Sequence, residues 1–125
     1  MAAQLTRREL DVMSVLWEHG SATVADVKAG IKDDIAYVTV LTILRTLESK
    51  GHVRHEQEGK AFRYYARLKS EAAGRGALSR VLDKMYRGSR EMLVAGLLDD
   101  EDISTAELKR LQKMINARLK EAKDE

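Results

Sequence analysis

Apolar and polar positions follow three successive patterns along the chain. Up to about residue 50, apolar side chains recur every three or four positions, which predicts α-helices. From His52 to Ala66 they alternate one by one around Glu58-Gly59-Lys60, which predicts a β-hairpin. The helical spacing then returns and continues to about Ala122. The predicted fold class is therefore mainly α with a small β-hairpin.

Capping residues delimit the first helices. Thr6 and Glu9 have the spacing of a capping box, so a helix is predicted from about Thr6 to His19. Thr23 is predicted to cap a second, short helix. Residues 21–23 are too few for a free-standing strand, and we expect them to pair with the hairpin as a third strand.

A third helix is predicted over residues 36–51, and its two faces differ. One face is an apolar stripe typical of a helix packed on a core, formed by Val40, Ile43, Leu44 and Leu47. The other face carries small hydroxyl side chains, a valine and an arginine, instead of the acids and lysines of an ordinary solvated face. Such a face can lie in a DNA major groove, where hydroxyls reach phosphates and base edges, a methyl group meets thymine and arginine binds guanine. By itself, this stretch could equally be a threonine-rich core helix.

The segments around this helix favour DNA binding. Two helices joined by a tight turn match a helix-turn-helix, and the hairpin that follows Gly51 has the position of a wing. Arg54, Lys60 and Arg63 are the predicted phosphate contacts of that wing, although each arginine could also belong to a solvated strand face. Between residues 45 and 67 there are six lysines and arginines but three glutamates, while the whole chain has a net charge of only +2. We therefore predict a winged helix-turn-helix DNA-binding domain over residues 1–69.

Residues 70–125 are predicted to form a helical dimerisation domain of three helices. The segment from Met92 to Leu98 is apolar on almost every side, and a chain segment this short cannot bury so many aliphatic side chains within itself. We therefore predict a homodimer; the alternative is a monomer in which these helices fold back onto the winged helix. The predicted dimerisation residues are Leu78, Val81, Leu82, Met85, Met92, Leu93, Leu97, Leu98, Leu108, Leu111 and Ile115.

Three motifs occur in a specific order along the chain. They are L-x-x-x-E-x-x-V-M-x-x-L-W from Leu5, T-V-x-T-x-L-x-x-L-x-x-K-G from Thr39, and a Gly-Ser pair at Gly88 that precedes Leu-Val. With this order and spacing, the sequence resembles the penicillinase repressors of the BlaI/MecI/CopY type over nearly its whole length. The resemblance implies a dimeric winged-helix repressor that binds a double-stranded inverted-repeat operator. It would silence genes for β-lactamases, penicillin-binding proteins or copper transport.

The resemblance also implies roles for individual residues. Thr39 and Thr42 match threonines of the family's recognition helix, whereas Leu41 stands where many relatives have arginine. The operator sequence is therefore left open. The predicted DNA-binding residues are Tyr37, Val38, Thr39, Leu41, Thr42, Arg45, Thr46, Arg54, Lys60 and Arg63.

Two regulatory motifs of the family are missing from the sequence. The Cys-x-Cys pair of the copper-sensing branch is absent, which argues against control by copper. In the β-lactamase branch, a signal from a membrane receptor leads to cleavage at an Asn-Phe pair, which would fall here at Gly96 and Leu97. Gly96 and Leu97 are therefore the predicted position of a proteolytic site, and a membrane-bound sensor/protease system acting upstream is a predicted partner.

Composition argues against several other classes of protein. With no cysteine, the chain has no disulfide and no thiolate metal site. No uninterrupted apolar run approaches the roughly 18 residues of a membrane span, and the N-terminus lacks the apolar region of a leader, so a cytoplasmic protein without membrane insertion is predicted. His52, His55 and Glu56 are a poor metal cluster, because strand residues three apart face opposite sides. No metal, cofactor or enzymatic activity is predicted.

The sequence thus predicts a homodimeric transcriptional repressor, with two alternatives. The first is a winged-helix regulator released from DNA by a small molecule, which requires a ligand-sized pocket near Met85, Met92 and Leu97. The second is a winged helix used only as a protein-interaction module, which would have no salt-dependent affinity for DNA.

Overall fold

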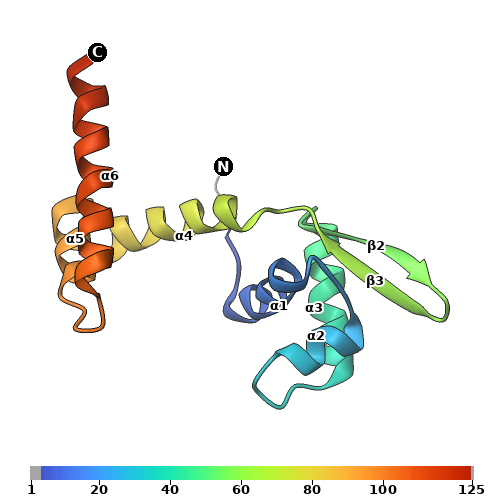
Figure 1. The fold of residues 1–125 in the computed structure, drawn as a ribbon. Helices are drawn as coiled ribbons and strands as arrows, with labels where there is room; N and C mark the ends of the chain where they lie inside the picture. The colour runs from blue at the N-terminus through green and yellow to red at the C-terminus, as the bar shows by residue number, and fades with distance from the viewer. Residues whose placement is uncertain (1–3, 125) are drawn as a thin grey trace. The chain divides into compact units, whose positions relative to one another are not determined.

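The described part of the chain consists of six helices and three short strands (Figure 1). The computed structural model describes residues 4–124. The elements are α1 (Arg7–His19), β1 (Ser21–Thr23), α2 (Val24–Gly30), α3 (Tyr37–Ser49), β2 (Val53–Glu58), β3 (Ala61–Ala66), α4 (Ser70–Met85), α5 (Arg90–Leu98) and α6 (Thr105–Asp124). The predicted fold class, mainly α with a small β-hairpin, is confirmed.

The chain divides into two compact units, Met1–Val81 and Leu82–Glu125. The first unit contains α1 to β3 and most of α4, and the second contains the end of α4 together with α5 and α6. The functional boundary predicted between residues 69 and 70 stays a prediction, because compactness does not report on DNA binding or dimerisation.

The three strands form one antiparallel sheet in the order β1-β3-β2. Ser21 of β1 lies opposite Tyr65 of β3, so the prediction that residues 21–23 form a third strand is confirmed. The chain reverses between β2 and β3 through Gly59 and Lys60. Gly59 has a φ of 62°, a left-handed conformation that glycine adopts without steric cost. The hairpin therefore turns where its alternation pattern predicted.

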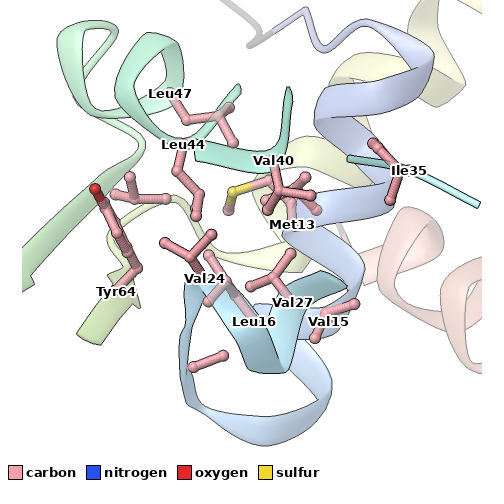
Figure 2. Close-up of a cluster of buried hydrophobic side chains, with 13 residues drawn as sticks. Met13, Val15, Leu16, Val24, Val27, Ile35, Val40, Leu44, Leu47 and Tyr64 are labelled. Atoms are coloured by element: carbon pink, nitrogen blue, oxygen red, sulfur yellow. The ribbon is translucent and has the colours of Figure 1, made fainter. Parts of the chain in front are cut away.

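The core of the first unit lies between α1, α2, α3 and the sheet (Figure 2). Figure 2 shows Val40 and Leu44 of α3 pointing into the same space as Met13 of α1. Tyr64 of β3 is buried against this cluster. The predicted apolar face of α3 is confirmed, with Ile43 half-buried at its edge. The largest side chains that are fully removed from solvent are Val12, Met13, Leu16, Val27, Val40, Leu44, Leu47 and Val53.

Hydroxyl side chains cap most of the helices, among them Thr6 and Thr23 as predicted. Thr6, Thr23, Ser89 and Ser104 each accept, through the side-chain oxygen, a hydrogen bond from the backbone N–H three residues later. These bonds satisfy N–H groups that have no partner inside a helix. The beginning of α3 differs, because its N-cap residue, Ala36, provides no side-chain hydrogen bond.

A left-handed glycine ends α3 and starts the path to the sheet. Gly51 has a φ of 83° and donates its N–H to the carbonyl of Glu48 at 3.0 Å, while the N–H of His52 donates to the carbonyl of Leu47 at 2.9 Å. This pair of bonds is a Schellman motif. It turns the chain so that β2 begins at Val53, directly after the helix.

Glu9 links the beginning of α1 to the end of α3. Its Oε1 accepts a hydrogen bond from the backbone N–H of Thr6 at 2.9 Å, which completes the predicted capping box. Its Oε2 accepts a hydrogen bond from Nζ of Lys50 at 2.8 Å, and the residue is only 4% exposed. Burial raises the pKa of Glu9, but the hydrogen bonds from Lys50 and Thr6 outweigh it and hold the pKa below its ordinary value of 4.5.

In the second unit, α5 and α6 leave their side chains accessible to solvent. No side chain between residues 82 and 123 is buried. The exposed large apolar side chains of these helices include three outside the predicted dimerisation set, namely Val94, Met114 and Leu119.

We predict that Glu9→Gln lowers the stability of the first unit by about 1 kcal/mol at neutral pH, because glutamine keeps the capping box but loses the ion pair with Lys50. The pKa of Glu9 is lowered on folding, so its negative charge contributes its full stabilisation at pH values above 4.5. This contribution is lost as the pH falls through the pKa of the folded state. The difference between the two proteins should therefore shrink as the pH falls below 4.5.

Urea denaturation followed by the fluorescence of Trp17, the single tryptophan of the chain, measures this difference. Glu9→Ala is the comparison, because it removes the capping box as well and should cost about 2 kcal/mol. Equal stability of Glu9→Gln and the unaltered protein at neutral pH would contradict the account.

Candidate DNA-binding surface

The predicted groove-facing side chains of α3 lie on its solvent side. Tyr37 and Val38 are 50% and 70% exposed. Leu41 is half-buried and packs against the edge of the core. The remaining predicted residues of this helix, Thr39, Thr42, Arg45 and Thr46, are all exposed. The structure thus brings the predicted residues of α3 together on one surface.

Three of the hydroxyl groups on this surface are engaged within the helix. Thr42 Oγ1 donates to the carbonyl of Val38 at 2.9 Å, and Thr46 Oγ1 donates to the carbonyl of Thr42 at 3.0 Å. Ser49 Oγ likewise donates to the carbonyl of Thr46 at 3.0 Å. Because each hydroxyl hydrogen is used internally, these side chains offer acceptor lone pairs and methyl groups outwards.

The sheet has two chemically different faces. Side chains directly opposite each other on antiparallel strands share a face, so His55 lies with Tyr64, and Arg54 lies with Tyr65. The His55 face contacts α3, because Nδ1 of His55 lies 2.6 Å from Oε2 of Glu48. Arg54 and its neighbours therefore lie on the face of the sheet away from α3.

The two predicted arginines of the wing are paired within the sheet. Arg54 Nη1 donates to Oε1 of Glu56 at 2.8 Å, and its guanidinium lies 4.3 Å from the ring centre of Tyr65. Arg63 donates to the carboxylate of Glu58 through Nε and to Oγ of Ser21 through Nη1. The sequence did not predict the contacts of Arg63, because they depend on how the three strands pair, whereas Arg54 and Glu56 lie on the same face of one strand.

Electrostatic effects in this region follow from the same contacts. The hydrogen bond with Glu58 raises the pKa of Arg63, with Asp26 nearby acting in the same direction. Hydrogen bonds from Thr23 lower the pKa of Asp26. Burial raises the pKa of Tyr64, and the charge of Glu48 adds to this effect.

Lys60 and Arg45 differ from the paired arginines. Lys60 lies in the turn at the tip of the hairpin, and neither residue forms an ion pair with any side chain in residues 4–123. They are the predicted DNA-binding cations whose charges remain available to an external anion.

The contact between Glu48 and His55 was not predicted. It joins α3 to β2, and the ring of His55 also lies 4.9 Å from that of Phe62 and 5.4 Å from that of Tyr64. The positions of the two residues in the sequence could have indicated it. When the chain reverses at Gly51, a helix residue shortly before the glycine meets a strand residue shortly after it. This contact ties the wing to α3.

The predicted dimerisation and proteolytic residues lie on α4, α5 and α6. Gly96 and Leu97 are in the last turns of α5, where Leu97 is exposed and Tyr86 Oη would lie 3.2 Å from a Cβ added at Gly96. Val81, Leu82, Leu93 and Leu111 are half-buried. The other predicted dimerisation residues are exposed, namely Leu78, Met85, Met92, Leu97, Leu98, Leu108 and Ile115.

The described part of the chain contains neither a membrane-spanning helix nor a cluster of metal-binding side chains. None of its helices combines the length and apolar character needed to cross a bilayer. Its histidine, aspartate and glutamate side chains form no group of three or more that could hold a metal ion.

The sequence matches the family described as penicillinase repressor over residues 5–117. The chain belongs to this family. MecI of Staphylococcus aureus strain N315, a methicillin resistance regulatory protein, is 24% identical over 115 residues, which cover 90% of this chain and 94% of MecI. The penicillinase repressor of Bacillus licheniformis is 25% identical over 114 residues, which cover 90% of this chain and 89% of that protein.

The family also accounts for the fold of the first unit. The solution structure of the DNA-binding domain of the repressor BlaI is similar, with a TM-score of 0.52 and 28% identity over 58% of this chain and 90% of that one. The helices and the three-stranded sheet of the first unit are therefore a winged helix.

We predict that His55→Ala loosens the wing without unfolding the first unit. The contact with Glu48 is partly exposed, so its loss should cost no more than about 1 kcal/mol. Amide hydrogen exchange should become faster in Val53–Glu58, while exchange at Leu44 in the core stays unchanged. Gln57→Ala is the matched control, because Gln57 lies on the same face of β2 and bonds only locally, to the carbonyl of Gly59. Unaltered exchange in β2 would contradict a role for this contact.

Proposed function

We propose that this protein acts as a homodimer that binds an inverted-repeat operator and represses transcription. Its membership of the penicillinase repressor family and the likeness to the BlaI DNA-binding domain support the coarser statement that it is a DNA-binding transcriptional repressor. The proposal goes further in three respects, namely the homodimer, the symmetry of the operator and the residues that contact DNA.

The division of α3 into two faces carries the proposal. Three apolar side chains hold the helix in the core, while its solvent face carries one tyrosine at its beginning, then mostly short side chains and one arginine. An α-helix with short outward side chains can enter the major groove of B-DNA closely enough for those side chains to touch base edges. In this arrangement Val38, Thr42 and Arg45 would face the bases.

Phosphate contacts would surround this helix. The N–H groups at the beginning of α3 lack a side-chain cap, and no acidic residue lies in its first turn, so the positive end of the helix is open to a phosphate. At the tip of the wing, Lys60 would contact the backbone beside the groove. Arg54 and Arg63 would take part only if DNA displaced Glu56 and Glu58 from them.

The exposed apolar side chains of α5 and α6 support a homodimer. On α6, Leu108, Leu111, Ile115 and Leu119 recur at helical spacing on one side. Contact with a second chain would remove these side chains from water, which is the driving force for most protein association. The resulting two-fold symmetry would present two copies of α3, so the operator would be an inverted repeat.

The relatives suggest the class of regulated genes and the inducing system. Because they are named for penicillinase and methicillin resistance, we propose that this protein regulates genes of β-lactam resistance. It would act in the cytoplasm. Induction would follow cleavage at Gly96 and Leu97 by a system that starts from a membrane-bound sensor. A protease would have to unwind the end of α5 first, because both residues are helical.

Arg45→Ala and Lys60→Ala should affect DNA binding in different ways. Loss of Arg45, as a base contact, should cost about 1–3 kcal/mol and relax the preference at one operator position. Loss of Lys60, as a phosphate contact, should weaken binding to all sequences alike and reduce the slope of log K against log salt by about one.

Fluorescence-anisotropy titrations on matched and mismatched duplexes at several salt concentrations distinguish these effects. Lys113→Ala removes the same charge as Lys60→Ala but lies on α6, so it should leave the salt slope unchanged. If Arg45→Ala kept both the affinity and the sequence preference of the unaltered protein, the proposed orientation of α3 would be wrong.

Ile115→Glu should convert the proposed dimer into a monomer, because it places a charge in an apolar interface. Since Ile115 is 56% exposed in the single chain, the variant should keep its helical content. Sedimentation equilibrium measures the molecular mass, and operator affinity should fall by at least about tenfold as the second half-site is lost. Lys113→Glu, on nearly the opposite side of α6, is the control that should remain dimeric. A monomeric unaltered protein, or a dimeric Ile115→Glu variant, would contradict the homodimer.

A further inference from the structure

The outward surface of α3 begins with an apolar patch, formed by Tyr37, Val38 and Leu41. Tyr37 and Val38 are 50% and 70% exposed, and Leu41 follows Val38 at the spacing of one helical turn. The first charged residue of α3 is Arg45, so no charge lies within the patch. Large apolar side chains that gather on the solvent side of a helix indicate a surface that is covered in the working state.

The polar groups beside the patch do not offset its apolar character. The hydroxyl hydrogen of Thr42 is used by the carbonyl of Val38, so the outward side of Thr42 is a methyl group and an oxygen acceptor. The first two turns of α3 therefore offer mainly methyl groups and one aromatic ring, with the hydroxyls of Tyr37 and Thr39 as their side-chain donors. Apolar contact is the larger part of what such a surface can offer to a base edge.

We propose that Val38 recognises the 5-methyl group of one thymine in each half-site, with Tyr37 and Leu41 completing the apolar contact. This inference rests on the proposed function and names part of what the DNA-binding surface reads. Among the four ordinary bases, only thymine presents a methyl group in the major groove. The N-terminal residues of a recognition helix contact the base edges, and Val38 is the second residue of α3.

The surroundings of the patch favour DNA over an apolar protein partner. The patch continues along α3 into Arg45, and the helix has no acidic residue before Glu48. It also adjoins the uncapped beginning of α3, where N–H groups point towards any bound anion. An anionic duplex with thymine methyl groups on its surface matches both the charge and the apolar contact.

The test removes single methyl groups from the DNA. An operator is selected from random duplexes with the full chain, and each of its thymines is then replaced in turn by deoxyuridine, which pairs identically and lacks only the 5-methyl group. Burial of one methyl group corresponds to about a fourfold change in affinity. We expect one thymine per half-site at which replacement weakens binding about fourfold, and about fifteenfold when both half-sites are changed.

The protein variant completes a double-mutant cycle with the modified DNA. Val38→Ala should bind the thymine duplex more weakly and should bind thymine and uracil duplexes equally. The variant should fold, because Val38 is outside the core and alanine is the better helix former. Ser49→Ala alters the same side of α3 three turns later and should keep the preference for thymine.

The outcomes separate this inference from the proposed function. If the protein selects an operator but no thymine responds to loss of its methyl group, or if Val38→Ala keeps the full discrimination, the assignment of Val38 is overturned. Failure to select any DNA sequence would overturn the proposed function and this inference together.

Discussion

The burial of one side of α3 is the constraint on which the candidate surface depends. Val40, Leu44 and Leu47 are completely removed from solvent in the core of the first unit. Burial of each is worth about 2 kcal/mol, so a rotation of α3 that exposed them would cost more than any contact of its outward side chains could return. The outward residues are therefore held in place by residues that never touch a ligand. Apart from Leu41, which packs against the edge of the core, these outward residues lie outside it, so their chemistry can follow the DNA sequence that they are proposed to read.

Local patterns in the sequence predicted the elements of the winged helix well. The caps at Thr6 and Thr23 and the reversal of the chain between β2 and β3 depend on residues close together in the chain, and the structure contains them. The predicted third strand is also present, although it pairs with a strand that lies far away in the sequence. The contacts of the wing were not predictable in this way. Alternation placed Arg54 and Glu56 on one face of β2, but it could not show which face of the sheet meets α3 or that Glu58 lies within reach of Arg63. The same is true of Lys50, whose partner Glu9 lies far away in the sequence.

The second unit differs from the first because its predicted helices form without a buried core of their own. Its helices and their apolar dimerisation residues were predicted, yet a single chain leaves most of these side chains accessible to solvent. Within the described residues of this unit, no other element covers the side chains of Leu108, Met114 and Ile115, which are all exposed. An excess of apolar surface at regular helical spacing is what a dimerisation element has before its partner is present. The winged helix therefore carries its own core, while the second unit is proposed to complete its core by association.

The central claim is that two copies of α3 read one symmetric site, and selection from a pool of random duplexes tests it most directly. The full chain is bound to the pool, the retained duplexes are sequenced, and the protein-to-DNA ratio and salt dependence are measured on the enriched sequence. The account predicts an inverted repeat, two chains per duplex, and an affinity that falls steeply as salt is raised. No enrichment above non-specific binding, or one chain on an asymmetric site, would contradict it.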